Sequence, residues 1–213
     1  DAAVAEPPFS VELEAKDIRL DQPLPEVKFI LPIFAGAKVT GTVGLEPVRL
    51  EGKGRTWEDI LATLHTVRDG RVVLGEGQIR DSRFLKTMAA ALRQPSLAEP
   101  RILGGEAVFR VKDRRVEQPG TVLRTTDGEI RMSGWVSFDG ALSQRTFLGG
   151  GFLRTGDRQQ DRALNVLMEK GVVTEGTLDD PVTRVDMKGV LEGLAKEAAK
   201  DLLLKGLEDL LKR

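Results

Sequence analysis

Apolar and polar residues alternate along much of the chain, a pattern typical of strands that bury one face. The first example is residues 9–15, which read Phe-Ser-Val-Glu-Leu-Glu-Ala. The alternation changes parity at Lys16–Asp17, where we expect a bulge. Residues 27–34 are nearly all apolar but contain Pro32, so they predict an edge strand or an irregular crossing. Residues 38–50 predict one or two further strands.

A second alternating region, residues 103–148, predicts a β-meander. Asp113 lies in the first expected turn, and Pro119–Gly120 separates two strands. The dipeptides Asp127–Gly128 and Asp139–Gly140 predict tight hairpins on either side of a strand over 129–138. Short loops of this kind join antiparallel neighbours, so we expect a twisted antiparallel sheet.

In three segments the apolar residues recur at the spacing of a helix instead of alternating. Thr56 with Asp59 three residues later resembles a capping box and predicts a helix near 56–66. A second helix is expected near 82–93, ended by Pro95. Residues 186–213 predict a long amphipathic helix, whose apolar stripe covers the domain or docks a partner. The stripe includes Leu191, Leu194, Leu203, Leu207 and Leu210.

Residues 157–170 fit either a helix or a strand. We favour a strand at 163–168, because residues 172–178 then provide a hairpin partner. The fold class predicted from all these elements is mainly β with α: a β-groove covered by two short helices and a long C-terminal one. Residues 1–8 are interpreted as a linker, residues 9–185 as an antiparallel β domain, and residues 186–213 as a helix packed on that domain.

Composition narrows the possible chemistry. The 213 residues carry a net charge of −1 and 5% aromatics, which argues against nucleic acid as a partner. The absence of cysteine removes disulfides, zinc–thiolate sites and thiol nucleophiles. His65 is the only histidine and has no nearby candidate nucleophile in the sequence. We therefore expect no catalytic residues, no metal site and no cofactor, and we interpret the chain as non-enzymatic.

Several blocks of sequence resemble the C-terminal region of the AsmA-like family of bacterial envelope proteins. They read LEGKGRTWEDILATL at 50–64, DGRVVLGEGQIRDSRFL at 69–85, TTDGEIRMSGWVSF at 125–138 and VVTEGTLDDPVTRVD at 172–186. The order of these short motifs carries the resemblance, which spans roughly residues 40–200. Departures are the His-Thr-Val-Arg stretch at 65–68, where a glycine-rich element is expected, and residues 157–170, which match no family pattern.

The resemblance implies a periplasmic module of a protein held in the inner membrane by a helix upstream of residue 1. Family members look similar to repeating β-groove lipid-transfer proteins. The implied function is outer-membrane biogenesis or transport of phospholipid, or another acyl-chain lipid, between membranes. Other envelope proteins are implied as possible partners.

Three strand faces are the candidate lipid contacts, provided that they point the same way. The apolar residues are Phe9, Val11 and Leu13 on the first face, Phe109 and Val111 on the second, and Ile130, Met132, Val136 and Phe138 on the third. The alternative is a structural or protein-interaction domain, in which these faces form a dry core and the C-terminal helix docks a partner. An enzyme with an unrecognised carboxylate site is the third reading, and the missing nucleophile, base and metal ligands argue against it.

Overall fold

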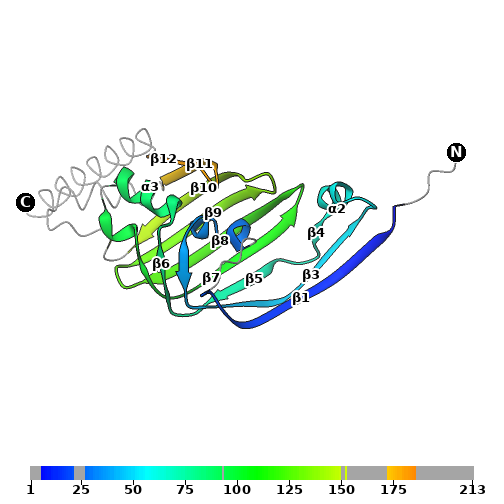
Figure 1. Ribbon diagram of the computed structural model, residues 1–213, viewed down its shortest axis with the longest axis horizontal. Coiled ribbons are helices and arrows are strands. Elements are labelled where there is room, and N and C mark those ends of the chain that lie inside the picture. The colour runs from blue at the N-terminus through cyan, green and yellow to red at the C-terminus, as the bar shows by residue number, and fades with distance from the viewer. Residues whose placement is uncertain (1–5, 22–26, 93, 150–151, 153–171, 186–213) are drawn as a thin grey trace, which may run out of the picture.

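The computed structural model describes residues 6–21, 27–92, 94–149, 152 and 172–185. Most of these residues belong to one open antiparallel sheet (Figure 1). Nine strands follow one another across it in the order β1-β3-β5-β7-β8-β9-β10-β11-β12, while β2, β4 and β6 pair beside this path. The predicted antiparallel, mainly β fold class is confirmed at this level.

The strands alternate with a few short helical segments. The strands are β1 (Pro8–Arg19), β2 (Lys38–Thr40), β3 (Thr42–Lys53), β4 (His65–Thr66), β5 (Gly70–Leu74), β6 (Gly77–Arg80), β7 (Arg101–Lys112), β8 (Arg115–Thr125), β9 (Glu129–Ser137), β10 (Ala141–Gly149), β11 (Val172–Thr177) and β12 (Pro181–Val185). The helices are α1 (Val27–Ile30), α2 (Trp57–Thr63) and α3 (Arg83–Leu92), with 3-10 turns η1 (Pro32–Phe34) and η2 (Pro95–Leu97).

The register of the sheet gives it one apolar face. Directly paired residues of antiparallel strands share a face, so rows of side chains cross the sheet perpendicular to the strands. One such row links six residues on six strands, all of them buried: Val43, Leu74, Gly105, Leu123, Ile130 and Leu148. Its neighbours along each strand point the other way and are more polar. The core of the described structure therefore lies on one side of the sheet.

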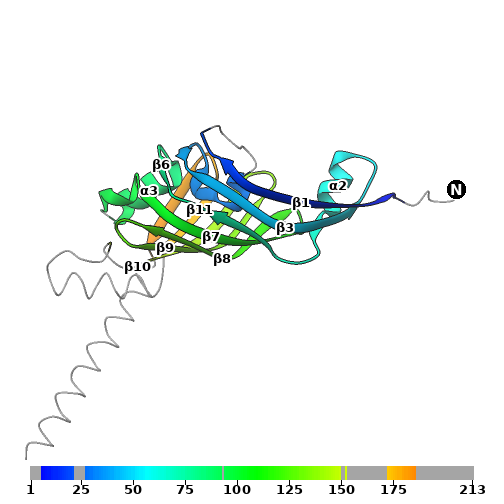
Figure 2. The same ribbon diagram turned by 90° about the horizontal axis from the view of Figure 1, so that it is seen from below.

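The helices lie on that same side (Figure 2). The half-buried apolar residues of α1 pack against the core, and its backbone lies over β8 and β9. The α3 helix buries Phe84, Leu85 and Met88 and packs against β12 and η1. Arg83 ties its first turn to the β11–β12 loop through the carbonyl of Asp179, 2.7 Å away. Together these elements form a partial second layer over the sheet.

Charged side chains occupy the opposite face. Arg71 bonds Glu106 on the neighbouring strand at 2.7 Å, and Arg110 makes two bonds to Asp69 at 2.8 and 3.1 Å. All four side chains are about half exposed. This face is built for contact with water, which leaves the apolar face as the candidate functional surface.

Local sequence signals account for the breaks in the strands. The expected bulge in β1 is confirmed, with register shifts between Leu13 and Ile18 and a positive φ of 49° at Asp17. The β7–β8 turn consists of Asp113 and Arg114, both with positive φ, as in a type I′ hairpin. Pro119–Gly120 does not separate two strands but makes a register shift inside β8, because proline cannot donate to the ladder.

The two Asp-Gly hairpins are confirmed, with loops of three residues. Asp127–Gly128 lies between β8 and β9, and Asp139–Gly140 between β9 and β10. The backbone closes through Thr125 N–H to the Gly128 carbonyl at 2.7 Å and Gly140 N–H to the Ser137 carbonyl at 2.9 Å. The expected strand over 129–138 is β9.

Two of the expected helices are confirmed as α2 and α3. The capping box of α2 has both halves, because Thr56 N–H donates to the Asp59 carboxylate at 3.0 Å and Asp59 N–H donates to the Thr56 hydroxyl at 3.2 Å. Helix α2 ends at Thr63, so His65 lies in β4 and not in the helix. The third expected helix, over 186–213, lies outside the described residues.

Residues 27–34 form a helical turn and a 3-10 turn, so of the two predicted alternatives, an edge strand or an irregular crossing, the edge strand is wrong. Leu31 and Ile33 are fully buried, and Pro32 begins η1, where its missing N–H is no loss. An unbroken apolar run is ambiguous between a buried strand and a segment that packs onto a sheet face. Here the run packs onto the face, where it needs no ladder partner.

The expected hairpin between 163–168 and 172–178 is also wrong. One edge of β11 pairs with β10 over Val172–Thr177, and the other pairs with β12. A strand has only two edges, so no third strand can join it. Residues 157–170 themselves lie outside the described residues.

Ser82 joins α3 to η1. It is fully buried, and its hydroxyl donates to the Ile33 carbonyl at 2.6 Å while accepting from Leu85 N–H at 3.2 Å. We expect Ser82→Ala to lower the free energy of unfolding by about 1–3 kcal/mol, because it removes a helix cap and leaves a buried carbonyl unpaired. Urea denaturation measures this, with Thr56→Ala at the exposed α2 cap as the comparison. A Ser82 variant less destabilised than the Thr56 variant would contradict the expectation.

Candidate lipid-contact face

The structure places the three predicted strand faces on one side of the sheet. Leu13 pairs with Val48, a buried core residue, and Val11 pairs with Leu50, which packs against the core. At the same end of the neighbouring strands, one row runs from Val111 through Val116 to Val136. At this end β4 lies between β3 and β7: Thr66 pairs with Leu50, and its hydroxyl accepts from Val111 N–H at 3.3 Å. These positions therefore belong to one continuous surface. None of the described side chains that point from these strands to this face is charged.

The solvent exposure of this face differs between the edge strand and the inner strands. Val11 and Leu13 on the edge strand keep 40% and 42% of their surface exposed, and Ile18 keeps 39%. Five predicted contacts on the inner strands are buried, with at most 6% exposed: Phe109, Val111, Ile130, Met132 and Val136. Phe9 is half-buried over Gly52, and Phe138 is half-buried beside Phe29. The face therefore has an open part on β1 and a closed part on β7 to β9.

A hollow of about 510 Å³ adjoins the open part, at the ends of β1 and β3. Its lining includes Phe9 and Gly52 from the apolar face, and Arg49 and Lys53 from the opposite side. The two cations are already paired: Arg49 lies 2.8 Å from Glu51, and Lys53 lies 3.9 Å from Glu6. The hollow therefore offers apolar contact rather than a free cation for an anionic group.

A row of polar side chains starts in the closed part of the face, on β8, and continues across the sheet to β12. Gln118, Gln144, Thr174 and Thr183 follow one another along it, with Gly134 between the two glutamines. The Gln144 amide donates to Gln118 Oε1 at 2.5 Å, and the Thr174 and Thr183 hydroxyls are 3.0 Å apart. Gly134 makes the first contact possible, because a Cβ there would lie 2.9 Å from the Gln144 side-chain carbonyl carbon.

The pattern of apolar residues alone did not predict this row. The sequence does contain a signal for it: Gln118, Gln144 and Thr174 each occupy a position that the alternation of their strand assigns to the buried face. Two buried atoms near the row, Gln144 Oε1 and Thr146 Oγ1, have no hydrogen-bond partner in the described part of the chain. Unpaired buried acceptors are uncommon and costly in folded proteins.

Within the described residues, the geometry holds no evident catalytic centre. The exposed ring of His65 lies 3.0 Å from the Thr63 carbonyl, with which its Nδ1 hydrogen-bonds. The hydrogen bond from Ser137 is the main cause of the lowered pKa of the Asp139 carboxyl, in a turn. The bond from Thr56 does the same for the pKa of Asp59, in a helix cap. No group of three potential metal ligands lies together in this part of the chain, and none of its helices has the length and hydropathy of a membrane span.

The predicted contacts on the C-terminal helix are not placed. Leu191, Leu194, Leu203, Leu207 and Leu210 all lie outside the described residues.

Comparison with known proteins identifies no relative. No family model matches the chain, and neither the curated proteins nor the solved structures contain a match.

Proposed function

We propose that this chain is a non-enzymatic lipid-handling module, which holds acyl chains against the apolar face of its sheet. The observation that carries the proposal is that the apolar face extends onto β1, past the part that the helices cover. Val11, Leu13 and Ile18 lie on the same surface as the buried core, yet each keeps about two fifths of its area exposed. Such a surface is unfavourable in water and is usually covered by a ligand or partner.

The chemistry of β1 favours an acyl chain as the cover. Its apolar residues Phe9, Val11 and Leu13 all point to the core side, while Ser10, Glu12 and Glu14 alternate with them on the other side. A hydrocarbon chain needs apolar contact and no hydrogen bonds, which is what this face offers. An enzyme substrate would need oriented polar groups, and the described open part has none.

The broader setting is proposed from the resemblance to AsmA-like proteins. The resembling block at 50–64 folds as the end of β3 and α2, and the block at 69–85 folds as β5, β6 and the start of α3. This order of strand, short helix, glycine-marked strand and helix supports the resemblance. We accordingly propose a periplasmic role in outer-membrane biogenesis or lipid transport between membranes, for a protein anchored through a segment upstream of residue 1. The amphipathic helix over 186–213 remains part of the proposal, as a further cover or a docking element for another envelope protein.

The second candidate is a structural or protein-interaction domain with a dry core. The burial of Ile130, Met132 and Val136 favours it, because side chains with at most 3% exposure reach no ligand in this conformation. In that case the exposed part of β1 would contact protein rather than lipid.

Native mass spectrometry separates these two candidates. The protein is purified in mild conditions, incubated with phosphatidylethanolamine–phosphatidylglycerol vesicles, separated from them and examined for bound phospholipid. We expect bound lipid in the natural sequence and at least a tenfold loss in the double variant V11K/L13K. Both positions are partly exposed, so the double variant should remain folded. The control Glu12→Lys places the same charge on the opposite face of β1 and should retain lipid. Absence of lipid from the natural sequence would contradict the proposal and favour the dry-core domain.

A further inference from the structure

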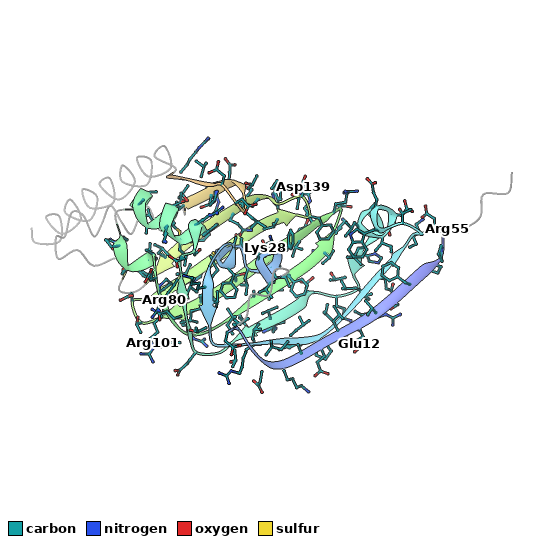
Figure 3. The ribbon with its side chains drawn as sticks, viewed as in Figure 1. Glu12, Lys28, Arg55, Arg80, Arg101 and Asp139 are labelled. Carbon is teal, nitrogen blue, oxygen red and sulfur yellow. The ribbon has the colours of Figure 1, made fainter. Side chains whose placement is uncertain are left out.

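We propose that α1 is a displaceable plug, which closes the inner part of the apolar face and withdraws to admit an acyl chain there. This inference rests on the proposed lipid-handling function. It adds that the buried strands β8 and β9 form a second, gated part of the lipid path. In Figure 1 the blue helical segment that contains α1, which carries no label, lies over the middle of the sheet, and Figure 3 places its Lys28 there, away from Glu12 on the edge strand.

The plug covers the apolar face through hydrophobic contacts, and the acyl chain of a lipid could make the same contacts in its place. Phe29 packs edge-on against Phe138 of the predicted lipid-contact set, with ring centroids 6.3 Å apart. Val27 and Ile30 also pack against the core. Every residue of α1 is only half-buried. Moving α1 away from the sheet therefore exposes less new apolar surface to water than moving a fully buried helix would.

The neighbouring turn η1 is built as an anchor. Leu31 and Ile33 are fully buried, and the Ser82 hydroxyl donates to the Ile33 carbonyl at 2.6 Å. The four residues of α1 thus precede a fixed point in the chain. A change of backbone torsion at Leu31, the residue between the two helical segments, is sufficient to swing α1 while η1 stays in place.

The polar row holds α1 in the closed state through side-chain hydrogen bonds. Gln118 donates to the Phe29 carbonyl at 2.6 Å and accepts from Gln144, so a chain of two amides holds the plug. Gln144 Oε1, at the far end of these two amides, and Thr146 Oγ1 are buried and have no hydrogen-bond partner among the described residues. A permanent core gains nothing from such a row, because apolar residues would fill the space without unpaired acceptors. A path that opens can supply the missing partners, from water or from a lipid hydroxyl or amide.

The absence of cysteine makes the plug directly testable, since F29C/F138C would provide the only two thiols. A cleavable bismaleimide then ties α1 to the β9–β10 loop, which contains position 138. Photo-methionine incorporated in place of methionine reports contact at Met132, which is 3% exposed, with little change of shape. Val11→Met adds a reporter on the open part. The full chain is incubated with the same phospholipid vesicles, irradiated and mapped by peptide mass spectrometry.

We expect lipid adducts at Met132 to fall at least tenfold when the tether is closed and to return when it is cleaved, while adducts at position 11 stay constant. The single-cysteine variant Phe29→Cys, treated with the reagent, should show no fall. Equal labelling of Met132 with the tether open and closed would overturn the plug. Labelling at position 11 without any at Met132 would also overturn it, because the inner part would then be permanent core, but would leave the proposed function intact. No lipid adduct at either position would remove both the plug and the proposed function.

Discussion

Replacing Val136 by aspartate is expected to unfold the protein or to lower its free energy of unfolding by roughly 3 kcal/mol or more. Val136 is fully buried, and its row neighbours are Val116 on β8 and Leu142 on β10, both also buried. A carboxylate there has no cation or donor in its row. Burial raises the pKa of such a group above its unfolded value, so the destabilisation should be smaller near pH 4 than at pH 7. Circular dichroism with urea denaturation at both pH values measures it.

The matched control is Val108→Asp, which also exchanges a valine for aspartate on a central strand. Val108 lies on the charged face, is only half-buried, and pairs with Arg71. We expect a loss within about 1 kcal/mol, because the new carboxylate stays in water beside a cation. Equal stability of the two variants would show that the apolar face around Val136 is wet, contrary to the burial described here.

Replacing Gly134 by alanine is expected to cost more than about 2 kcal/mol, a large effect for one methyl group. The new Cβ would lie 2.1 Å from the Ser143 carbonyl oxygen and 2.8 Å from the Gln144 Cα, both backbone atoms of the adjoining strand. The φ of Gly134, +155°, is also one that residues with a side chain rarely adopt. Either β9 and β10 separate locally or the Gln118–Gln144 contact is lost.

Gly120→Ala is the control within the same sheet. A Cβ at Gly120 meets no atom within 4 Å, and its φ lies outside the left-handed region. Alanine there should change stability by less than about 0.5 kcal/mol or stabilise slightly, by restricting the unfolded chain. A Gly134 variant as stable as the Gly120 variant would contradict the close packing of the polar row.

Local signals were enough to predict much of the sheet. The alternation of residues 9–15, the bulge at Lys16–Asp17 and the two Asp-Gly turns each depend on the chain within a few residues, and each appears in the structure. The capping box at Thr56 is of the same kind. Such features follow from backbone torsion preferences and side-chain hydrogen bonds, which a sequence shows directly.

The features that the sequence did not predict have one physical cause: they depend on packing against residues that are distant in the sequence. Residues 27–34 could pair or pack, and only the far strands β8 and β9 decide between these outcomes. The same holds for Gln118 and Gln144, which are 26 residues apart and meet only through the register of β8, β9 and β10. Alternation also identifies an apolar face without indicating which part of it is covered. Only the structure therefore shows that Val11 is exposed whereas Val136 is buried.

Position-specific photo-crosslinking tests most directly whether lipid lies on the apolar face of the sheet. Val11 and Glu12 are neighbours on β1 whose side chains point to opposite faces, so V11M and E12M, each carrying photo-methionine, probe the two faces at the same place along the strand. Incubated with phosphatidylethanolamine–phosphatidylglycerol vesicles and irradiated, the V11M protein should yield phospholipid adducts at position 11 at least tenfold more often than the E12M protein does at position 12. Equal labelling at the two positions, or none at position 11, would contradict the proposed lipid contact.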